Sequence, residues 1–432
     1  MRILVVGSGG REHALAWKIA QSPLVSALQA APGSDAIADL ATCFPEIAAG
    51  DVDGIVALAR AQSIDLVVVG PEDPLVAGLA DRLRDAGIAT FGPSAAASRL
   101  EGSKSFAKDF MRRHRIPTAD FAVFDDLEAA RAHVARLPEG CVVKADGLAA
   151  GKGVTVCETP ERALAALDEA MGDRRFGDAG ARVVIEERLV GEEASYYAIS
   201  DGEHVVTLAP AQDHKRALDG DRGENTGGMG AYVPAPVVDE AVEKKILERV
   251  VHPAIRGLAA DGMPYRGVLF VGLMIDASGD PRVIEFNVRF GDPETQPLLV
   301  AMESDLVPLL DAAARGHLDR VAPPQSRGAA VCVVLASEGY PRSHPKGRAI
   351  RGLDAAGDPD VVVFHAGTRR GDDGGFVTAG GRVLGVTARG DAVADARERA
   401  YRAVDRIAFD GVQVRRDIAS RALARAGDGG GG

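Results

Sequence analysis

The sequence predicts a multidomain protein with α/β and α+β parts: an N-terminal parallel α/β domain, a central domain, and a small β-rich C-terminal domain. The 432 residues exceed what one hydrophobic core normally serves. The first hundred residues alternate short apolar runs with helical patterns, whereas strands are more frequent from about residue 100. After Pro323 and Pro324, apolar strands recur between glycine turns. These changes of pattern predict the three domains.

The composition is that of an ordinary globular protein. It is 46% hydrophobic and 26% charged, and its mean hydropathy is zero. The formal net charge of −12 argues against nucleic acid or an anionic membrane as a partner, although local arginines can still bind anionic small molecules. No stretch approaches the roughly 18 consecutive apolar residues of a membrane span.

The N-terminus and the cysteines predict a cytoplasmic protein. The first residues, MRILVVGSGG, contain an apolar run too short for a signal peptide. The cysteines are far apart and form no CxxC or Cys/His ligand pattern, so buried, reduced thiols are expected. They are Cys43, Cys141, Cys157 and Cys332.

The N-terminal domain is predicted from two strand–turn–helix units. An apolar strand from Ile3 to Val6 ends at the glycine turn 7–10, and a helix follows from about Arg11. A second strand, Leu66 to Val69, ends at the turn 70–72. Because ligands bind at the carboxyl ends of parallel strands, both turns are candidate binding sites.

The first of these turns, with Gly9 and Gly10, is predicted to bind a phosphate. Its backbone N–H groups and the positive end of the helix can hold phosphate oxygens. Glu12 occupies the third glycine position of the dinucleotide fingerprint, and no acidic residue closes the second strand. A monophosphate or phosphosugar therefore fits better than NAD. The alternative interpretation as a dinucleotide-binding oxidoreductase has no support in the sequence besides this turn. The alternative is a tight turn without a ligand.

In the central domain, residues 144–153 are interpreted as a flap over ATP. Their glycines permit close backbone approach, and their lysines can neutralise polyphosphate. The segment departs from the Walker pattern because Gly153 replaces serine or threonine and a strand follows. A flexible hairpin is the alternative. Around it, strands are predicted at 142–144, 154–157, 183–187 and 195–200, and a helix at 161–171.

Two further segments are candidates for ligand contact. The strand at 183–187 is followed by carboxylates. Its backbone groups can bind adenine, and a carboxylate can bind the ribose hydroxyls of a nucleotide. The alternative is that these acidic residues are simply solvated. Residues 212–216 supply basic and amide groups before the glycine-rich segment 224–230, which is predicted to lack regular structure and to form a loop around a ligand. A plain surface loop is the alternative. His214 is assigned no role in proton transfer.

The run IEFNVRFGDPETQ, residues 284–296, carries the strongest chemical signal. Strand alternation places Glu285, Asn287 and Arg289 on one face and the apolar residues at 284, 286, 288 and 290 toward a core. A carboxylate and an amide oxygen suit Mg²⁺, and an arginine fork suits phosphate or carboxylate oxygens. The alternative is the solvated face of an antiparallel sheet.

Taken in order, the motifs resemble the phosphoribosylamine–glycine ligase family of the ATP-grasp superfamily. The usual first turn of that family reads GNGGREH, and this chain has Ser8 in place of the asparagine. The resemblance covers essentially the whole chain and rests on GSGGREHALAWK, GPEDPLV, LEGSKSFAKDF, KADGLAAGKGV, IEERLVGEEAS, QDHKR, NTGGMGAYVPAPVV, IEFNVRFGDPETQ, FHAGT and GGRVLGVTA.

The resemblance implies that ATP, glycine and 5-phosphoribosylamine give glycinamide ribonucleotide, ADP and phosphate through glycyl phosphate, with Mg²⁺ or Mn²⁺ as metal. Together with the composition it predicts a substrate-binding domain at 1–100, an ATP-grasp domain at 101–325 with a lid at about 122–192, a C-terminal domain at 326–425 and a disordered tail at 426–432. A monomer or weak homo-oligomer is expected. The alternatives are another ATP-grasp ligase or carboxylase, and a catalytically silent nucleotide-binding protein.

The resemblance also assigns roles to residues. The expected metal ligands are Glu285 and Asn287, and since the strand 267–275 contains no acid, phosphate oxygens and water would complete the shell. The expected catalytic residues are Arg289, Lys144, Asp213 and Lys215. The expected nucleotide contacts are Lys104, Lys144, Gly147, Gly151, Lys152, Gly153, Glu186, Glu187, Leu189, Glu192 and Glu193. The expected substrate contacts are Gly9, Gly10, Arg11, Glu12, Gly70, Pro71, Glu72, Asn225, Thr226, Asp292, Pro293 and Glu294.

Overall fold

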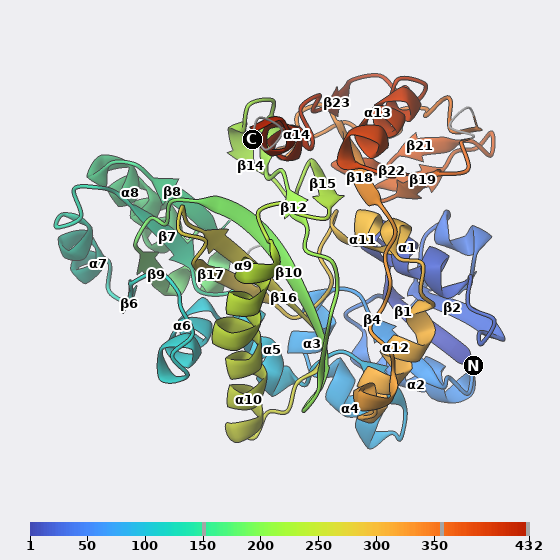
Figure 1. The fold of residues 1–432 in the computed structure, drawn as a ribbon, viewed down its shortest axis with the longest axis horizontal. Coiled ribbons are helices and arrows are strands. Elements are labelled where there is room, and N and C mark those ends of the chain that lie inside the picture. Colours follow the sequence, from blue (N-terminus) through green and yellow to red (C-terminus); the bar gives the residue numbers. More distant parts are fainter. Residues whose placement is uncertain (149–152, 355–357, 429–432) are drawn as a thin grey trace.

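The computed structural model describes residues 1–148, 153–354 and 358–428 (Figure 1). The N-terminal domain, in blue, and the lid, in teal, lie on opposite sides of a central sheet, and the C-terminal domain, in orange and red, lies above both the centre and the N-terminal domain. Among the described helices, none combines the length and apolar character that crossing a bilayer requires.

The N-terminal domain is built on a five-stranded parallel sheet in the order β3-β2-β1-β4-β5. The order reverses at β1, so the carboxyl ends of β1 and β4 open toward one crevice, as expected for this type of sheet. The strands are β1 (Arg2–Gly7), β2 (Ala27–Pro32), β3 (Thr42–Cys43), β4 (Leu66–Val69) and β5 (Ala89–Phe91). The helices are α1 (Gly10–Ile19), η1 (Ile37–Asp39), α2 (Val52–Ala61), α3 (Glu72–Val76), α4 (Leu79–Asp85) and α5 (Ala95–Gly102).

The lid is a four-stranded antiparallel sheet, β6-β9-β7-β8, with its own apolar cluster around Val143, Leu167 and Ile185. The predicted helix 161–171 ends earlier as an α-helix and continues as a π-helical turn. The elements are α6 (Lys104–Arg113), which leads into the lid, β6 (Phe121–Phe124), α7 (Leu127–Val134), β7 (Cys141–Ala145), β8 (Val154–Cys157), α8 (Pro160–Leu167), η2 (Asp168–Gly172), η3 (Gly177–Ala181) and β9 (Val183–Glu186).

The central sheet is antiparallel, in the order β11-β10-β16-β17. Its strands are β10 (Glu192–Asp201), β11 (Val205–Thr207), β16 (Arg266–Ile275) and β17 (Pro281–Asn287). The helical elements that follow or flank these strands are α9 (Glu240–Ile246), η4 (Leu247–Val251), α10 (His252–Ala260), α11 (Thr295–Ala301), α12 (Leu306–Arg315) and η5 (Leu318–Arg320).

The predicted alternation along residues 284–290 is only partly correct. Opposite β17, Gly272 pairs with Glu285 but Leu273 pairs with Val283, so Ile284 is an extra residue in a bulge and lies half-buried. The strand ends at Asn287, yet Val288 and Phe290 are buried in the core beyond it. The bulge re-aims the side chains at the end of the strand, which is where the candidate metal ligands lie.

The C-terminal sheet includes two strands from the middle of the chain. β12 and β15 join the C-terminal strands in the order β12-β15-β18-β22-β19, and β23 also pairs with β18. The strands are β12 (Gln212–Asp213), β15 (Gly230–Val233), β18 (Ala329–Ser337), β19 (Val361–His365), β22 (Arg382–Gly390) and β23 (Val412–Val414), and α13 (Val393–Val404) packs on β18 and β22.

Two hairpins and a final helix complete the fold. The hairpins are β13 (Arg216–Leu218) with β14 (Arg222–Asn225), and β20 (Thr368–Arg370) with β21 (Phe376–Thr378). The first shows that the segment expected to lack regular structure contains a short ladder. Helix α14 (Ser420–Asp428) includes residues 426–428, which we had assigned to the tail, whereas 429–432 lie outside the described residues.

Candidate active site

Glu285 and Asn287, the expected metal ligands, lie at the end of β17. A Cβ atom on Gly272 would stand 3.2 Å from Glu285 Cγ, so the glycine in β16 leaves room for the carboxylate. Burial opposes the charge of Glu285, but Lys215, Lys144 and Lys104 hold its pKa below the ordinary value. Asn287 is buried, and its Nδ2 atom has no hydrogen-bond partner within the described residues. The two oxygen donors fit a hard divalent cation.

The acidic residues that interact electrostatically with Glu285 lie on elements other than β16. β16 contains no acid, as the sequence indicated. Glu193 on β10 and Glu101 on α5 both interact electrostatically with Glu285. The Oε2 atom of Glu193 lies 2.9 Å from Lys215 Nζ, and Lys215 is 4.0 Å from Asp213 Oδ1. The carboxylates at this centre are therefore balanced by cations from several segments.

Arg289 connects the end of the central sheet to the N-terminal domain. Its Nε atom donates to Glu72 Oε2 at 3.2 Å, and its Nη2 atom lies 2.8 Å from Glu101 Oε1. Burial opposes its charge, but these two carboxylates raise its pKa above the ordinary value. Glu101 also accepts the Val288 N–H at 2.8 Å. Arg289 is thus held between two carboxylates in this structure.

Glu101 is a site residue that we did not assign from the sequence. Burial raises its pKa to about 7 in spite of Arg289. It stands within the LEGSKSFAKDF motif, whose lysine at 104 we did assign. The signal that could have found it is its position at the end of a helix that leads directly into that lysine.

Lys144 and Lys104 lie where the flap was expected. Lys144 Nζ donates to Ile284 O at 3.0 Å and lies 2.9 Å from Glu186 Oε1. The other oxygen of Glu186 lies 2.9 Å from Lys108 Nζ. Both oxygens of this buried carboxylate are therefore engaged by lysines, and Lys108 was not assigned from the sequence. The nucleotide contact expected at Glu186 stays a prediction. Lys104 Nζ donates to Gly147 O at 3.1 Å, and burial lowers its pKa.

The flap itself is only partly described. A Cβ atom on Gly147 would stand 2.7 Å from Ala179 Cβ, so the flap packs closely on η3. Gly153 accepts the Ala145 N–H at 2.8 Å through its carbonyl. Gly151 and Lys152, which we assigned to ATP, lie outside the described residues.

The acids after β9 point in different directions. Glu187 is exposed and pairs with Arg282 at 2.7 Å, while Leu189 is half-buried. Glu192 pairs with Arg425 at 3.0 Å, whereas its neighbour Glu193 reaches Lys215. Since adjacent residues of β10 face opposite sides of the sheet, only Glu193 of this pair faces the Glu285 cluster.

The segment around Asp213 lies beside the same cluster. Asp213 is buried, and burial raises its pKa. Burial opposes the charge of Lys215, but Asp213, Glu193 and Glu285 raise its pKa well above the ordinary value. Burial and then Asp213 raise the pKa of Glu294 to about 7. These titratable groups are close enough to influence one another, which is a common property of catalytic sites.

The glycine-rich loop is held by Thr226. Its hydroxyl donates to Lys215 O at 2.8 Å and accepts the Gly228 N–H at 3.0 Å, while Asn225 ends β14. His214 accepts the Ala419 N–H at 3.0 Å and contacts Arg415.

The first glycine turn is braced by Glu12. Its carboxylate accepts the Gly9 N–H at 2.7 Å and the Arg11 Nε–H at 2.6 Å. A Cβ atom on Gly70 would stand 2.2 Å from Glu12 Oε1, so the second turn, with Pro71, packs directly on the same carboxylate. Glu12 therefore holds the two turns together, which explains an acid at a position where the dinucleotide fingerprint has glycine.

Asp292, Pro293 and Glu294 bring the centre and the C-terminal domain to this turn. Asp292 Oδ1 accepts a hydrogen bond from Gln296 Nε2 at 2.9 Å. The other oxygen of Asp292, Oδ2, lies 3.3 Å from Nη2 of Arg382, which is on β22. Glu294 accepts from Ser195 at 3.3 Å. Arg382 was not assigned from the sequence, because nothing in the GGRVLGVTA motif indicates a partner 90 residues away.

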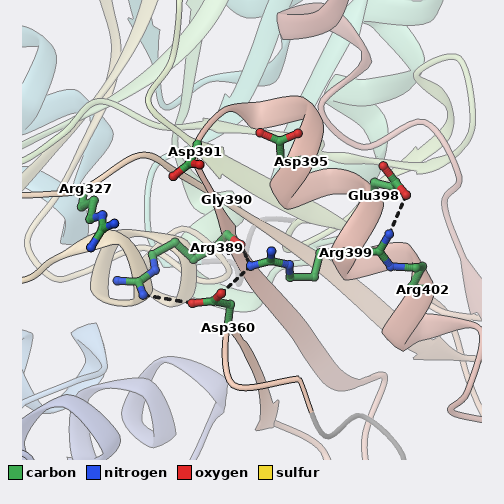
Figure 2. Close-up of a pocket in the computed structure, with 9 residues that line it drawn as sticks. All are labelled: Arg327, Asp360, Arg389, Gly390, Asp391, Asp395, Glu398, Arg399 and Arg402. Carbon is green, nitrogen blue, oxygen red and sulfur yellow. Dashed lines mark hydrogen bonds and ion pairs between the residues drawn. The ribbon is translucent and has the colours of Figure 1, made fainter.

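A separate charged cavity, of about 320 Å³, lies in the C-terminal domain (Figure 2). Arg389 and Arg399 share the carboxylate of Asp360, and Arg402 pairs with Glu398. None of the residues we assigned to the site lines it. Its lining residues are Arg327, Asp360, Arg389, Gly390, Asp391, Asp395, Glu398, Arg399 and Arg402.

Comparison with known proteins identifies relatives along the whole chain. Models of the phosphoribosylglycinamide synthetase N domain, ATP-grasp (A) domain and C domain match residues 1–101, 102–295 and 330–421. The chain is 54% identical over 426 residues to a phosphoribosylamine–glycine ligase of Allochromatium vinosum, covering 98% of this chain and 99% of the relative. It is 51% identical over 427 residues to the protein of that name from Salmonella typhimurium, again covering 98% and 99%.

Solved structures give the same result. The crystal structure of phosphoribosylamine–glycine ligase from Thermotoga maritima matches with a TM-score of 0.85 and 34% identity, covering 97% of this chain and 100% of that chain. A biotin carboxylase from Campylobacter jejuni matches with a TM-score of 0.73 and 16% identity, covering 96% and 92%. At that identity, the second match shows a shared fold only.

Proposed function

Because the chain belongs to the phosphoribosylglycinamide synthetase family, it is an ATP-dependent ligase of purine biosynthesis, and we propose that the residues gathered around Glu285 carry its chemistry. The reaction joins glycine to 5-phosphoribosylamine and gives glycinamide ribonucleotide, ADP and phosphate through glycyl phosphate. The observation that carries the proposal is a half-buried carboxylate that three lysines keep ionised, at the junction of the lid, the centre and the N-terminal domain.

We propose that Glu285 and Asn287 hold Mg²⁺ or Mn²⁺. Their carboxylate and amide oxygens are hard donors, and the Nδ2 atom of Asn287, which has no hydrogen-bond partner among the described residues, supports an amide that is free to turn its oxygen toward an ion. The bound ion would offset the charge of the ATP phosphates. Since β16 supplies no acid, the nucleotide and water would complete the shell.

The lysines and Arg289 act on charge and position. The carboxylate of glycine is already ionised at neutral pH, so it needs alignment with the γ-phosphate more than it needs a base. Lys144 is fixed by Ile284 and Glu186, and Lys104 by the flap at Gly147. Cations held in this way can stabilise charge on the transferred phosphoryl group without reorganising.

The lid excludes water from the reaction. Glycyl phosphate and phosphoribosylamine both hydrolyse readily, so an exposed site would lose them. The lid has an apolar cluster of its own and reaches the centre through polar contacts such as Lys144 with Ile284. These features support closure of the lid as a unit over bound ATP.

The amine substrate lies at the N-terminal turns. The start of α1 presents the backbone N–H of Gly10, while the N–H of Gly9 is held by Glu12, and Arg11 supplies a cation beside them. Glu72 faces the same region through Arg289, and Glu294 interacts electrostatically with Lys215. This arrangement supports phosphate binding at the turn, with the amine directed toward the Glu285 cluster.

The remaining assignments concern partners and location. We infer that the protein acts on small molecules as a monomer or weak homo-oligomer, without nucleic acid, because its net charge is −12. We place it in the cytoplasm, where ATP is available and where its four cysteines, all of them free thiols, would stay reduced.

Isotope transfer tests the route. Glycine labelled with ¹⁸O in its carboxylate should pass one labelled oxygen to the released phosphate, because that oxygen attacks the γ-phosphate and remains on phosphorus when the amine displaces it. Mass spectrometry of the phosphate measures the label. A reaction with unlabelled glycine in ¹⁸O water is the control and should give unlabelled phosphate. Unlabelled phosphate from labelled glycine would exclude the acyl-phosphate route.

A further inference from the structure

Arg382 leaves the C-terminal domain to contact two segments of the active site. It is the first residue of β22, and its Nη1 atom donates to Gly227 O and to Asp292 O, each at 2.6 Å. Its Nη2 atom lies 3.3 Å from Asp292 Oδ2. One guanidinium therefore joins the C-terminal sheet, the glycine-rich loop and the segment that follows β17.

The packing around this guanidinium is close. A Cβ atom on Gly227 would stand 3.1 Å from Arg382 Cζ, so the guanidinium lies against the loop backbone. A Cβ atom on Gly228 would stand 2.5 Å from Pro293 Cδ, and Gly228 has a φ of +109°, which glycine adopts readily. The loop is thus pressed onto residues 292 and 293, and Arg382 fixes how the two segments meet.

Asp292 faces the turn that we assign to the amine substrate. Its Oδ1 atom lies 3.7 Å from the position of a Cβ atom on Gly10, and its Oδ2 atom lies 3.9 Å from that on Gly9. Burial raises the pKa of Asp292, but Arg382 and Arg11 outweigh burial and lower it. An ionised carboxylate accepts hydrogen bonds from hydroxyl groups. The hydroxyls of a phosphopentose whose phosphate lies on the turn fit this description.

We propose that Arg382 is a positioning residue for phosphoribosylamine, which orients Asp292 toward the ribose hydroxyls and fixes the glycine-rich loop beside them. The proposal rests on the function proposed above. It gives the C-terminal domain a share in binding the amine substrate, while the nucleotide side of the site, with Lys104 and Lys144, has no contact with Arg382 among the described hydrogen bonds and ion pairs.

Arg382→Gln tests the proposal, and Arg389→Gln is its matched control. Both arginines lie on β22, about 23 Å apart for seven strand residues, and Arg389 pairs with Asp360 at 2.9 Å in the charged cavity (Figure 2). Losing a charge-assisted contact should raise the KM for phosphoribosylamine roughly 10- to 100-fold with Arg382→Gln. The KM values for ATP and glycine should stay within about twofold, as should every constant of Arg389→Gln.

A double-mutant cycle with Asp292→Asn separates positioning from a general structural role. If Arg382 acts through Asp292, the double variant should raise the KM for phosphoribosylamine little more than either single variant does. Arg382→Lys keeps the charge but not the forked geometry, so it should fall between wild type and Arg382→Gln, and it replaces Arg382→Gln in the test if the glutamine variant does not fold.

Three results would overturn the proposal: an unchanged KM for phosphoribosylamine, an equal rise in the KM values for ATP and the amine, or additive effects in the cycle. Wild-type protein that does not join glycine to phosphoribosylamine would instead refute the proposed function. The two failures are therefore distinguishable in one set of assays.

Discussion

The lid and the C-terminal domain both border the active site, but they are attached to the molecule in different ways. The lid contributes no described residue to the two largest apolar clusters, and it reaches the centre through charged and polar contacts such as Lys108 with Glu186. The C-terminal domain shares a sheet with β12 and β15, and its Phe364 belongs to the cluster of the N-terminal domain. Polar contacts suit a part that opens, whereas a shared ladder and core suit a fixed wall.

The largest effect should come from the centre that both regions border. Glu285→Ala removes the carboxylate of the proposed metal site, and turnover should fall at least about 10³-fold. The lid and the C-terminal domain should remain folded, because neither depends on this side chain in its core. Steady-state kinetics and circular dichroism measure the two quantities.

Glu285→Gln is the control for volume, since it keeps the side-chain size and removes the charge. Loss of folding, with normal specific activity in the protein that stays soluble, would show that Glu285 is structural. The centre that the lid and the C-terminal domain both border would then not be the catalytic centre.

The next largest effect should come from the charged attachment of the lid. Glu186→Gln leaves Lys108 and Lys144 without their buried counter-charge, at a cost of about 3 kcal/mol in the free energy of unfolding. Burial already lowers the pKa of Lys108 to about 8 with Glu186 present. The KM for ATP should rise, and amide hydrogen exchange in β9 should accelerate.

Glu187→Gln is the neighbouring control. Glu187 pairs with Arg282 at the surface, where an ion pair contributes less than about 1 kcal/mol. Equal effects of the two substitutions on stability and exchange would contradict the view that the buried pair attaches the lid.

The contrast between the two regions also shows what the sequence can predict. The strands at 66–69 and 154–157 were predicted with the bounds of β4 and β8, because each is an apolar run between turns. The bulge at Ile284 depends on how β16 pairs, which β17 alone does not encode. Of the acids that the resemblance assigned to the nucleotide, Glu193 reaches Lys215, whereas Glu192 pairs with Arg425.

Individual partners were not predictable. Glu186 was expected among the nucleotide contacts, and its sequence context did not indicate that two lysines on separate elements engage it. Arg382 reads as an ordinary strand residue until the fold places it on Asp292. Periodicity reports which face of an element is buried, but the pairing of charges across distant segments is decided only when the domains pack.

A third effect should be a pH dependence that arises where the C-terminal domain meets the N-terminal domain. The His365 N–H donates to His13 Nδ1 at 2.9 Å where β19 meets α1, and burial lowers the pKa of both imidazoles to about 4. Between pH 6.5 and 4 the unfolded chain binds protons that the folded protein does not, so the free energy of unfolding should fall as pH falls, by roughly 2 kcal/mol per imidazole at pH 5. Trp17 is the one tryptophan of the chain, and its ring centroid lies 5.6 Å from that of Phe364. Its fluorescence during urea unfolding therefore reports the contact between α1 and β19. His13→Gln should reduce the fall in the free energy of unfolding between pH 6.5 and 4. Hydrogen exchange in β7 of the lid should change less over the same pH range. If His13→Gln leaves the pH dependence of the free energy of unfolding unchanged, the histidine pair does not hold the C-terminal domain against α1.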